Sequence, residues 1–345
     1  MSIQSQAAGS IRPAQPTALA IEAADLVKTY PKGIRALDGL SFSVATGTVF
    51  GLLGPNGAGK STTVKILTTL AQADSGHASV AGFDVRTQPA RVRRVIGVVA
   101  QQSGSDPVAT GRENLLLTGR IQGLRGRTLN QRADELLSRF ALADAAGRQV
   151  RTYSGGMRRR LDVALGLIHR PEVLFLDEPT AGLDPESRSA MWDEIARLSA
   201  SEGLTILLTT HYLEEADRLA SRLAIVDRGR IVAAGTPDEL KGRLHGDAVQ
   251  VELAAPGVPD QVRVAVARVP GIQETTMTGR TVSARADDGA TAVPALLAAL
   301  NQAGIAVHGV TAARPSLDDV YLRFTGRRFA DASPAQDASL TGGSR

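Results

Sequence analysis

A glycine-rich run contains residues whose types and spacing can bind phosphate. Gly54, Gly57 and Gly59 belong to the pattern Gly-x-x-x-x-Gly-Lys-Ser, which ends at Lys60 and Ser61. Glycines hold no side chain against the ligand, so successive backbone N–H groups can curl around phosphates at the start of a helix. Lys60 can reach the β- and γ-phosphates, and Ser61 offers a hydroxyl to Mg²⁺. The run therefore predicts a site for a nucleoside triphosphate.

Two carboxylates follow an apolar run later in the chain. Val173–Leu176 has the composition of a buried strand, and Asp177 and Glu178 come directly after it. An aspartate in this place can hold Mg²⁺ through water, and a glutamate beside it can polarise an attacking water. Acidic residues at the end of a strand are common and usually structural. The stretch Pro179–Asp184 directly after them favours the functional interpretation over the structural one.

The phosphate-binding run needs a strand before it and a helix after it. Thr48–Leu53 is a short apolar strand pattern, and Ser61–Leu70 has the apolar spacing of a helix. From Ala20 to about Gly235, strand patterns alternate with helical ones, which predicts a parallel sheet covered by helices. Mostly helical spacing from Thr110 to His169 predicts a helical insertion beside the sheet.

The pattern of apolar and polar residues changes after the segment Thr236-Pro-Asp-Glu-Leu. Strand patterns are expected at Ala248–Leu253 and Thr281–Ala286, and a helix at Ala292–Ala303. Gln261–Val269 and Ile305–Val310 fit either a short strand or a short helix. We expect a small α+β domain here, and disordered tails at 1–19 and 328–345, because these ends are poor in large apolar residues.

Composition sets wide limits on the kind of protein. The 345 residues are 43% hydrophobic and include no cysteine, which excludes disulfides and thiolate metal sites. The longest apolar runs have the length of strands and fall short of the roughly 20 residues that cross a bilayer. We therefore expect no membrane span. Residues 1–18 have no apolar segment of the signal-peptide kind, so we expect a cytoplasmic chain. The net charge of +4 is scattered, with one local cluster at Arg158–Arg160. Charge alone does not identify a partner.

Several motifs in a fixed order resemble those of ABC ATPases. Tyr153-Ser-Gly-Gly-Met157 is similar to the LSGGQ signature of that family and precedes the strand of Asp177. Gln101 closes the apolar run Ile96–Ala100 as the Q-loop glutamine does. His211 follows the strand Thr205–Thr210 as the switch histidine does, and Tyr30 lies where the family stacks an aromatic ring on adenine. The resemblance covers residues 20–240.

The resemblance implies ATP and Mg²⁺ as cofactors and ATP hydrolysis as the activity. It implies an α/β fold, with a P-loop ABC-type domain at 20–240 that has a mainly parallel sheet and a helical subdomain at about 105–170. The C-terminal α+β accessory domain expected from the sequence pattern spans 247–327. The implied catalytic residues are Glu178, His211 and Gln101, and the implied metal ligands are Ser61, Gln101 and Asp177. The implied nucleotide-binding residues are Tyr30, Gly54, Pro55, Asn56, Gly57, Ala58, Gly59, Lys60, Ser61, Thr62, Ser154, Gly155, Gly156 and Asp184.

The signature departs from its commonest form and resembles one branch. Tyr153 and Met157 replace leucine and glutamine, and Met157 cannot donate the hydrogen bond of a glutamine. The form YSGGMRRRL resembles the drug-resistance exporter branch, the ATP-binding subunits similar to the daunorubicin resistance protein. We expect at least two of the three arginines at 158–160 to form a solvated face. The segment Arg314–Gly326 resembles the closing motif of that branch, and it is also the pattern of a terminal helix capped by Ser316.

The branch implies the ATP-hydrolysing subunit of an exporter of a drug-like, antibiotic or lipophilic compound. Its implied partners are a separate integral membrane permease and a second copy of the chain, with no nucleic acid, at the cytoplasmic face of the cell membrane. The alternative is a soluble ABC-type ATPase that acts on nucleic acid or ribosomes, for which the basic net charge is the motive. A third possibility, compatible with the first, is that residues 248–325 bind a regulatory ligand or stabilise the dimer.

Overall fold

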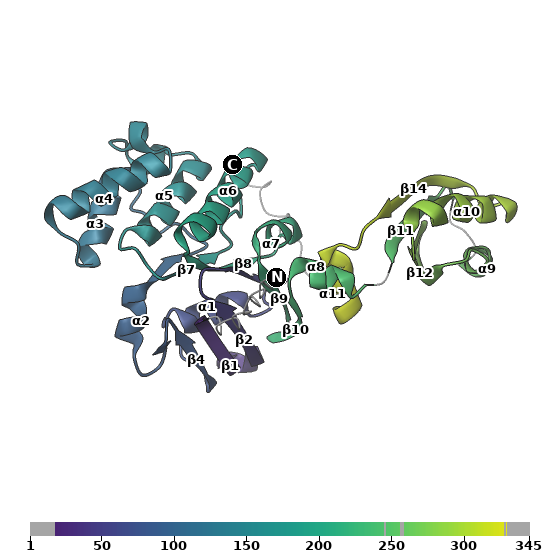
Figure 1. The fold of residues 1–345 in the computed structure, drawn as a ribbon, viewed down its shortest axis with the longest axis horizontal. Helices are drawn as coiled ribbons and strands as arrows, with labels where there is room; N and C mark the ends of the chain where they lie inside the picture. Colours follow the sequence, from purple (N-terminus) through teal and green to yellow (C-terminus); the bar gives the residue numbers. More distant parts are fainter. Residues whose placement is uncertain (1–17, 245, 256–258, 328, 330–345) are drawn as a thin grey trace, which may run out of the picture. The chain divides into compact units, whose positions relative to one another are not determined.

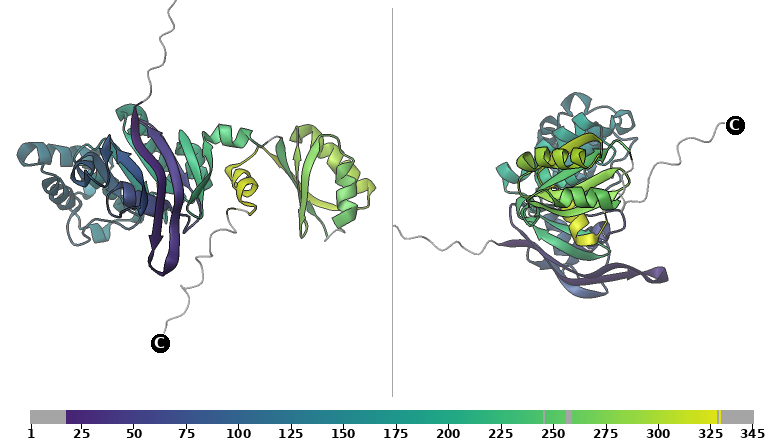
Figure 2. Two further views of the ribbon diagram at one scale, coloured as in Figure 1. Left: turned by 90° about the horizontal axis from the view of Figure 1, so that it is seen from below. Right: turned by 90° about the vertical axis from the view of Figure 1, so that its right-hand side faces the viewer.

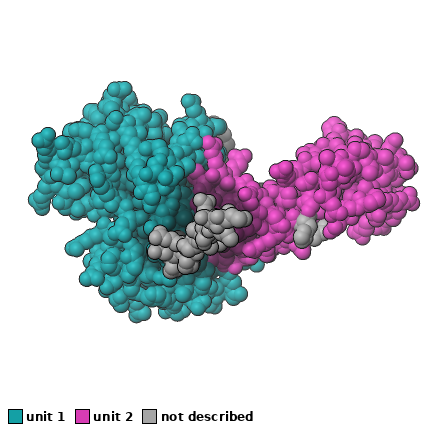
Figure 3. Space-filling view, viewed as in Figure 1, with its two compact units in different colours: residues 1–51, 59–210, 228–230 teal, residues 52–58, 211–227, 231–345 magenta. Residues whose placement is uncertain are grey.

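The computed structural model describes residues 18–244, 246–255, 259–327 and 329. The tails expected at 1–19 and 328–345 lie outside these residues except for residues 18, 19 and 329. The chain divides into two compact units (Figure 3): residues 1–51, 59–210 and 228–230 form unit 1, and residues 52–58, 211–227 and 231–345 form unit 2. This division runs through the phosphate-binding run, so it does not follow the expected boundary at 240–247, which stays a prediction.

Unit 1 begins with an antiparallel sheet of strand order β2-β1-β4-β5. Its strands are β1 (Leu19–Tyr30), β2 (Ile34–Ala45), β4 (Ser75–Val80) and β5 (Phe83–Asp84). The three-residue 3₁₀ turn Pro31–Gly33 joins β1 to β2 and is too short for the crossover that parallel strands need. The expectation of parallel strands from Ala20 onward is therefore wrong for this region, where Ala23 pairs with Phe42 in an antiparallel register.

A second sheet has six strands in the order β10-β9-β3-β8-β7-β6, and its strands β6, β7 and β8 pair in parallel. The strands are β3 (Val49–Leu53), β6 (Ile96–Val99), β7 (Val173–Asp177), β8 (Thr205–Thr210), β9 (Arg222–Asp227) and β10 (Arg230–Gly235). Phe175 of β7 pairs in parallel with Val98 of β6 and with Leu207 of β8. All six residues of β8 are buried, as expected for a strand covered on both faces. Parallel β6, β7 and β8 end at one edge of the sheet, where Asp177 is the last residue of β7 and where Gln101 and Glu178 follow β6 and β7.

Helices cover the strands of unit 1 and form the expected insertion (Figure 1). They are α1 (Lys60–Leu67), α2 (Pro89–Val95), α3 (Gly111–Ile121), α4 (Gly126–Arg139), α5 (Gly155–Leu167) and α6 (Pro185–Glu202), with 3₁₀ turns at Ala143–Ala145 and Val150–Thr152. Helices α3, α4 and α5 pack against one another and lie between Thr110 and His169, as the sequence predicts. Thr110 and Glu113 form a capping box that begins α3.

The C-terminal part of unit 2 forms a sheet of strand order β12-β13-β11-β14. It contains β11 (Asp247–Leu253), α9 (Pro259–Ala267), β12 (Ile272–Thr278), β13 (Thr281–Ala286), α10 (Gly289–Gln302) and β14 (Val307–Ala313). Helices α9 and α10 lie on one face of the strands (Figures 1 and 2). Their apolar side chains, including Leu296 and Val262, pack with Val251 and Val282 of the sheet. We refer to β11–β14 with α9 and α10 as the C-terminal sheet.

A second apolar cluster in unit 2 contains the closing helix. Helices α7 (Leu213–Leu219) and α8 (Pro237–Gly242) precede the C-terminal sheet, and α11 (Leu317–Thr325) follows it. Leu317, Val320 and Tyr321 of α11 are buried against Leu223 and Leu240. Ser316 caps α11 and forms a capping box with Asp319, so the predicted capped terminal helix is confirmed. None of the described helices is long and apolar enough to cross a membrane.

Candidate functional site

The phosphate-binding run forms a turn that requires glycine between β3 and α1. A Cβ atom added to Gly54 would lie 2.4 Å from the carbonyl oxygen of Val226. One added to Gly59, where φ is +112°, would lie 2.6 Å from the carbonyl oxygen of Ala36. Gly57 has φ of +82° and open space around it, and Asn56 beside it is exposed. A tight turn with an open tip at the start of a helix fits a phosphate group.

Lys60 begins helix α1 and is buried, with 4% of its surface exposed. Its Nζ lies 3.7 Å from Oε1 of Glu178. Burial lowers the pKa of the Lys60 ammonium, whereas the charges of Glu178 and Asp177 act in the opposite direction. The ammonium is therefore held by carboxylates in a place where phosphate oxygens would give it further partners.

Asp177 ends strand β7 and accepts hydrogen bonds from two hydroxyl groups. Ser61 Oγ donates to its Oδ1 at 3.3 Å, and Thr209 Oγ1 donates to the same atom at 2.5 Å. A carboxylate and a serine hydroxyl are ligands that Mg²⁺ accepts together with phosphate oxygens and water. In the described part of the chain no three His, Cys, Asp or Glu side chains form a metal cluster. The oxygens of Ser61 and Asp177 fit Mg²⁺ that is also bound by the phosphates of a nucleotide.

Glu178 is buried and its backbone is in an unusual conformation. Its φ is +49°, in the left-handed region that a glutamate rarely adopts. Its N–H donates to the carbonyl oxygen and to Oγ1 of Thr209, both at 3.1 Å. Gln101 Nε2 donates to Glu178 Oε2 at 3.0 Å. Conformations of this kind persist where the surroundings hold them, and they concentrate at functional sites.

Five predicted residues thus meet through side-chain contacts. We call Lys60, Ser61, Gln101, Asp177 and Glu178 the carboxylate cluster. Two other candidates have ring contacts: Lys28 Nζ lies 5.8 Å from the centre of the Tyr30 ring, and the His211 and Tyr212 ring centres are 4.2 Å apart. The remaining members of the run, Pro55, Ala58 and Thr62, lie in the turn and the first turn of α1.

The signature turn caps helix α5. Ser154 is the N-cap of α5 and its side chain accepts a hydrogen bond from the N–H of Met157 at 3.2 Å. Ser154 and Gly155 are exposed, and a Cβ on Gly156 would lie 2.6 Å from Ser187 Oγ. Asp184 is the exposed N-cap of α6, and hydrogen bonds from Ser187 lower its pKa. The turn therefore presents helix N–H groups at the surface, where an anion can reach them.

Tyr153, which replaces the leucine of the common signature, makes a structural contact that a leucine could not make. The side chain is 4% exposed, and its hydroxyl donates to the carbonyl oxygen of Ala145 at 2.8 Å. A Cβ on Gly111 would lie 2.3 Å from that hydroxyl oxygen. Burial raises the pKa of the Tyr153 phenol. The ring thus fixes the signature turn to the start of α3.

The three arginines after the signature do not form a solvated face, and that expectation is wrong. Arg158 is exposed, but Arg160 is half-buried and donates to the carbonyl oxygen of Phe140 at 3.2 Å. Arg159 is 7% exposed and donates to the carbonyl oxygens of Ala100, Asp177, Glu178 and Pro179 at 2.6–3.1 Å. Sequence reasoning missed Arg159 because three adjacent arginines on a helix carry no mark of which one faces inward. It also missed Thr209, whose only signal is its place near the end of β8.

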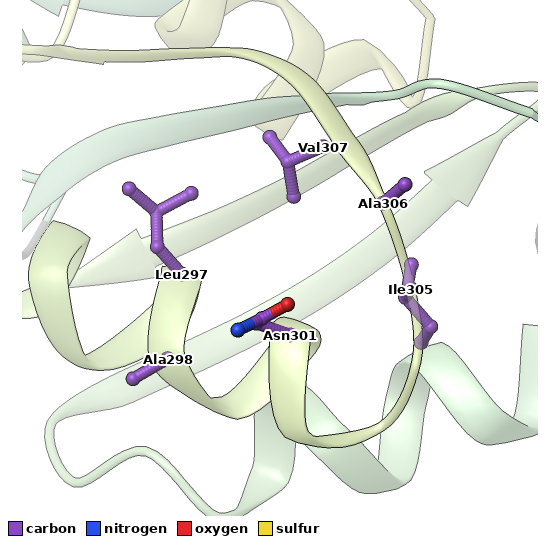
Figure 4. A pocket seen from close by; sticks show the side chains of 6 residues that line it. All are labelled: Leu297, Ala298, Asn301, Ile305, Ala306 and Val307. Carbon is purple, nitrogen blue, oxygen red and sulfur yellow. The ribbon is translucent and has the colours of Figure 1, made fainter.

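The C-terminal sheet has a hollow of different chemistry (Figure 4). Its volume is about 380 Å³, and it is lined by Leu297, Ala298, Asn301, Ile305, Ala306 and Val307. The lining lies on α10, on β14 and on the turn between them, and it contains no charged group. Asn301 is the polar side chain of this lining. Such a hollow does not suit the triphosphate of a nucleotide, so the carboxylate cluster remains the candidate site.

Two family models match consecutive parts of the chain. The ABC transporter model matches residues 37–181, and the model of the C-terminal domain of DrrA1-3-like ATP-binding proteins matches residues 235–325. The chain is 49% identical to the daunorubicin resistance ATP-binding protein DrrA2 of Streptomyces coeruleorubidus, over 92% of this chain and 99% of that protein. It is 45% identical to the daunorubicin/doxorubicin resistance ATP-binding protein DrrA of Streptomyces peucetius, over 94% and 97%.

One similar solved structure shares the fold of part of the chain. It is the dimeric ATP-binding cassette MJ0796 in a post-hydrolysis state, bound to ADP and Pi, with a TM-score of 0.58 and 25% identity. The similarity covers 63% of this chain and 98% of that one. The turn, the carboxylate cluster and the signature cap thus occur in a chain whose relatives match it almost from end to end. The chain belongs to the ATP-hydrolysing, ATP-binding subunits of the ABC transporter family, in the branch of the daunorubicin and doxorubicin resistance ATP-binding proteins.

Proposed function

We propose that this chain powers the export of a drug-like, antibiotic or lipophilic compound through a separate membrane permease. The observation that carries the proposal is the carboxylate cluster, in which Lys60 and Gln101 both contact the buried carboxylate of Glu178. The names of relatives that match nearly the whole chain refer to drug resistance, which supports export as the purpose of hydrolysis. They do not support the alternative of action on nucleic acid or ribosomes.

The phosphate-binding turn and the carboxylate cluster divide the work of hydrolysis. Residues 54–62 hold the phosphates through backbone N–H groups and Lys60, and Tyr30 stacks on the adenine. Ser61, Gln101 and Asp177 are the residues that would hold Mg²⁺, which supplies positive charge to the phosphates when bound. Glu178 accepts a proton from the attacking water and so orients it for attack, assisted by His211. The position of Glu178 supports this assignment, because its buried carboxylate lies beside Lys60 of the phosphate-binding run and accepts a hydrogen bond from Gln101.

The exposed signature turn serves a second copy of the chain. Ser154, Gly155 and Gly156 of one copy contact the γ-phosphate that the turn of the other copy holds, and Asp184 lies beside the shared site. Support comes from the exposure of Ser154, Gly155 and Asp184 at two helix N-termini, because helix N-termini favour negative charge. Closing of the dimer on ATP and its opening after hydrolysis then move the permease at the cytoplasmic face of the membrane.

The C-terminal sheet stabilises the dimer in this account. Its hollow has no charged lining, which argues for packing rather than for binding of an ionic ligand. A chain truncated after Gly246 should still hydrolyse ATP and dimerise more weakly. If the truncated chain dimerises and supports transport as well as the full chain does, this role is wrong.

Isolation of the tagged chain from detergent-solubilised native membranes tests the proposal. We expect a multi-spanning membrane protein to be recovered in near-equal amount and identified by mass spectrometry. A chain with Lys60→Met serves as the control, because assembly with a permease does not require nucleotide contacts. Recovery from the cytosol with ribosomes or DNA, and salt-dependent DNA binding at physiological ionic strength, would contradict the proposal and support the alternative.

A further inference from the structure

Arg159 binds the backbone at the end of two neighbouring strands. Its Nη1 donates to the carbonyl oxygen of Ala100 at 2.6 Å, just after β6. Its Nη2 donates to the carbonyl oxygens of Asp177 at 3.0 Å and Glu178 at 3.1 Å, and its Nε donates to that of Pro179 at 2.7 Å. A planar guanidinium with five donors and a fixed charge is suited to hold several carbonyl groups in one arrangement. The residues on both sides of the β6–β7 edge are thus tied to one side chain of α5.

Glu178 depends on this arrangement for its backbone conformation. Its φ of +49° is unfavourable for a residue with a Cβ atom. Thr209 accepts the hydrogen bond from its N–H, and Arg159 donates to its carbonyl oxygen. Both peptide groups that flank the left-handed residue are therefore held from outside strand β7. We expect that loss of either contact would let the backbone relax and turn the carboxylate away from Gln101 and Lys60.

Asp162 holds the other side of Gln101 from the same face of α5. It lies three residues after Arg159, so the two side chains are neighbours on the helix. Ser103 Oγ donates to Asp162 Oδ1 at 2.8 Å, and Asp162 is 6% exposed. Burial raises the pKa of Asp162, whereas the hydrogen bond from Ser103 and the charge of Arg159 lower it. Gln101 therefore lies between Ala100, which Arg159 holds, and Ser103, which Asp162 holds.

We propose that Arg159 and Asp162 are positioning residues that couple the signature turn to Gln101 and Glu178 within one chain. Helix α5 begins at Gly155 and continues through both residues, so a shift of the turn moves both contacts together. Engagement of a phosphate at Ser154 is then transmitted to the chain's own Glu178 as well as to the shared site. This inference rests on the proposed role of Glu178 in hydrolysis.

The test compares two buried arginines in the full-length chain. Arg132 of α4 is the matched control, because it is also buried, with 9% of its surface exposed. It donates to the backbone carbonyl oxygen of Leu167, in α5, at 2.9 Å, and it does not contact the carboxylate cluster. We expect Arg159→Lys to lower kcat for ATP hydrolysis by about 10- to 100-fold, the scale of a reacting group displaced by about 1 Å. We expect KM and the Kd for ATP to change by less than about twofold, because contacts of the phosphate-binding turn remain. Arg132→Lys should lower Tm by about as much as Arg159→Lys does, but it should leave kcat within about twofold of that of the unaltered chain.

A double-mutant cycle separates positioning from loss of stability. Gln101→Ala should lower kcat less in the Arg159→Lys chain than in the unaltered chain, because Gln101 is already displaced there. Independent, additive effects would contradict the proposal, and so would an unchanged kcat in Arg159→Lys or an equal loss in Arg132→Lys. If Arg159→Lys does not fold, Ser103→Ala is the second variant. It should lower kcat severalfold without changing Kd, and an unchanged kcat there would overturn the coupling.

Glu178→Gln, measured in parallel, tells the two failures apart. If Glu178→Gln keeps full hydrolysis, the proposed role of Glu178 is wrong, and the proposal that Arg159 and Asp162 position it for hydrolysis fails with it. If Glu178→Gln abolishes hydrolysis while Arg159→Lys leaves it unchanged, the proposed function stands and the coupling alone is refuted.

Discussion

The carboxylate cluster and the C-terminal sheet are stabilised by opposite means. In the cluster, Lys60 and Glu178 are both buried charges, and Glu178 has a φ of +49°. In the C-terminal sheet, alternate residues such as Val249, Val251 and Leu253 point into an apolar cluster completed by α9 and α10. The sheet follows the period-2 pattern of an ordinary half-buried strand. The cluster breaks local preferences and depends on neighbours to hold it.

The contrast indicates where chemistry and where packing dominate. Buried charges and a left-handed glutamate lower stability unless other groups compensate, so their survival in one place points to a function. Apolar packing with regular alternation needs no such explanation. Substitutions in the C-terminal sheet should therefore change stability and leave hydrolysis unchanged, whereas substitutions in the cluster should do the reverse.

Leu296→Ala should have the largest effect on stability. Leu296 of α10 is fully buried in the apolar cluster of the C-terminal sheet. Its truncation should lower the free energy of unfolding by about 2–5 kcal/mol, measured by urea denaturation. Val264→Ala is the control, because Val264 on α9 is 55% exposed and should change stability by less than about 0.5 kcal/mol. A loss of kcat in the folded Leu296→Ala chain would break the comparison.

Gly54→Ala should lower both the stability and the affinity for ATP, because it alters the turn that precedes Lys60. The added Cβ would lie 2.4 Å from the carbonyl oxygen of Val226, and the overpacking should cost about 1–3 kcal/mol of unfolding free energy. ATP affinity, measured by calorimetry, should fall with it. Gly57→Ala is a useful contrast, because Gly57 has no atom within 4 Å of the added Cβ. Equal losses in the two variants would show that backbone strain, not the clash, controls the turn.

Tyr321→Phe should have the smallest effect of the three. The Tyr321 hydroxyl donates to Asp227 Oδ1 at 3.1 Å, and Arg327 Nη2 lies 2.6 Å from the same atom. Because Arg327 still satisfies the carboxylate, loss of the hydroxyl should cost about 1 kcal/mol in thermal unfolding. Phe324→Leu, at a position that is 42% exposed, should cost less than about 0.5 kcal/mol. A change in kcat would contradict a purely structural place for α11.

Much of the fold was predictable where periodicity and chain connection agree. The strands β3, β7 and β8 lie within a residue of their predicted bounds, and the helix after the phosphate-binding run begins at Lys60. The alternation at 281–286 gave β13 with its bounds unchanged. Gln261–Val269, which fitted a strand or a helix, overlaps α9, which ends at Ala267. In contrast, β12 was missed because its run Ile272–Thr278 is rich in polar residues. The antiparallel pairing of β1 with β2 was missed because alternation does not report strand direction.

The sequence singled out the five residues of the carboxylate cluster, whose roles stay predictions, but not the residues that support them. Each pair is adjacent in the sequence: Lys60 precedes Ser61, and Asp177 precedes Glu178. The fold brings the two pairs together at the end of β7. Arg159 acts over distances of 18 to 59 residues in the chain. Successive helix positions differ by about 100°, so only the fold decides which of three adjacent arginines faces the sheet. Long-range contacts of this kind leave no periodic signal in the sequence.

Hydrolysis and binding of ATP by Glu178→Gln, measured on one preparation, test the central claim most directly. The amide keeps the size of the side chain but cannot accept a proton from water. We expect kcat to fall by about 10²- to 10⁴-fold, with the Kd for ATP changed by less than about twofold. Glu172→Gln, at an exposed glutamate just before β7, should leave both values unchanged. An unaltered kcat in Glu178→Gln would contradict the account, because the carboxylate cluster would then not be where ATP is hydrolysed.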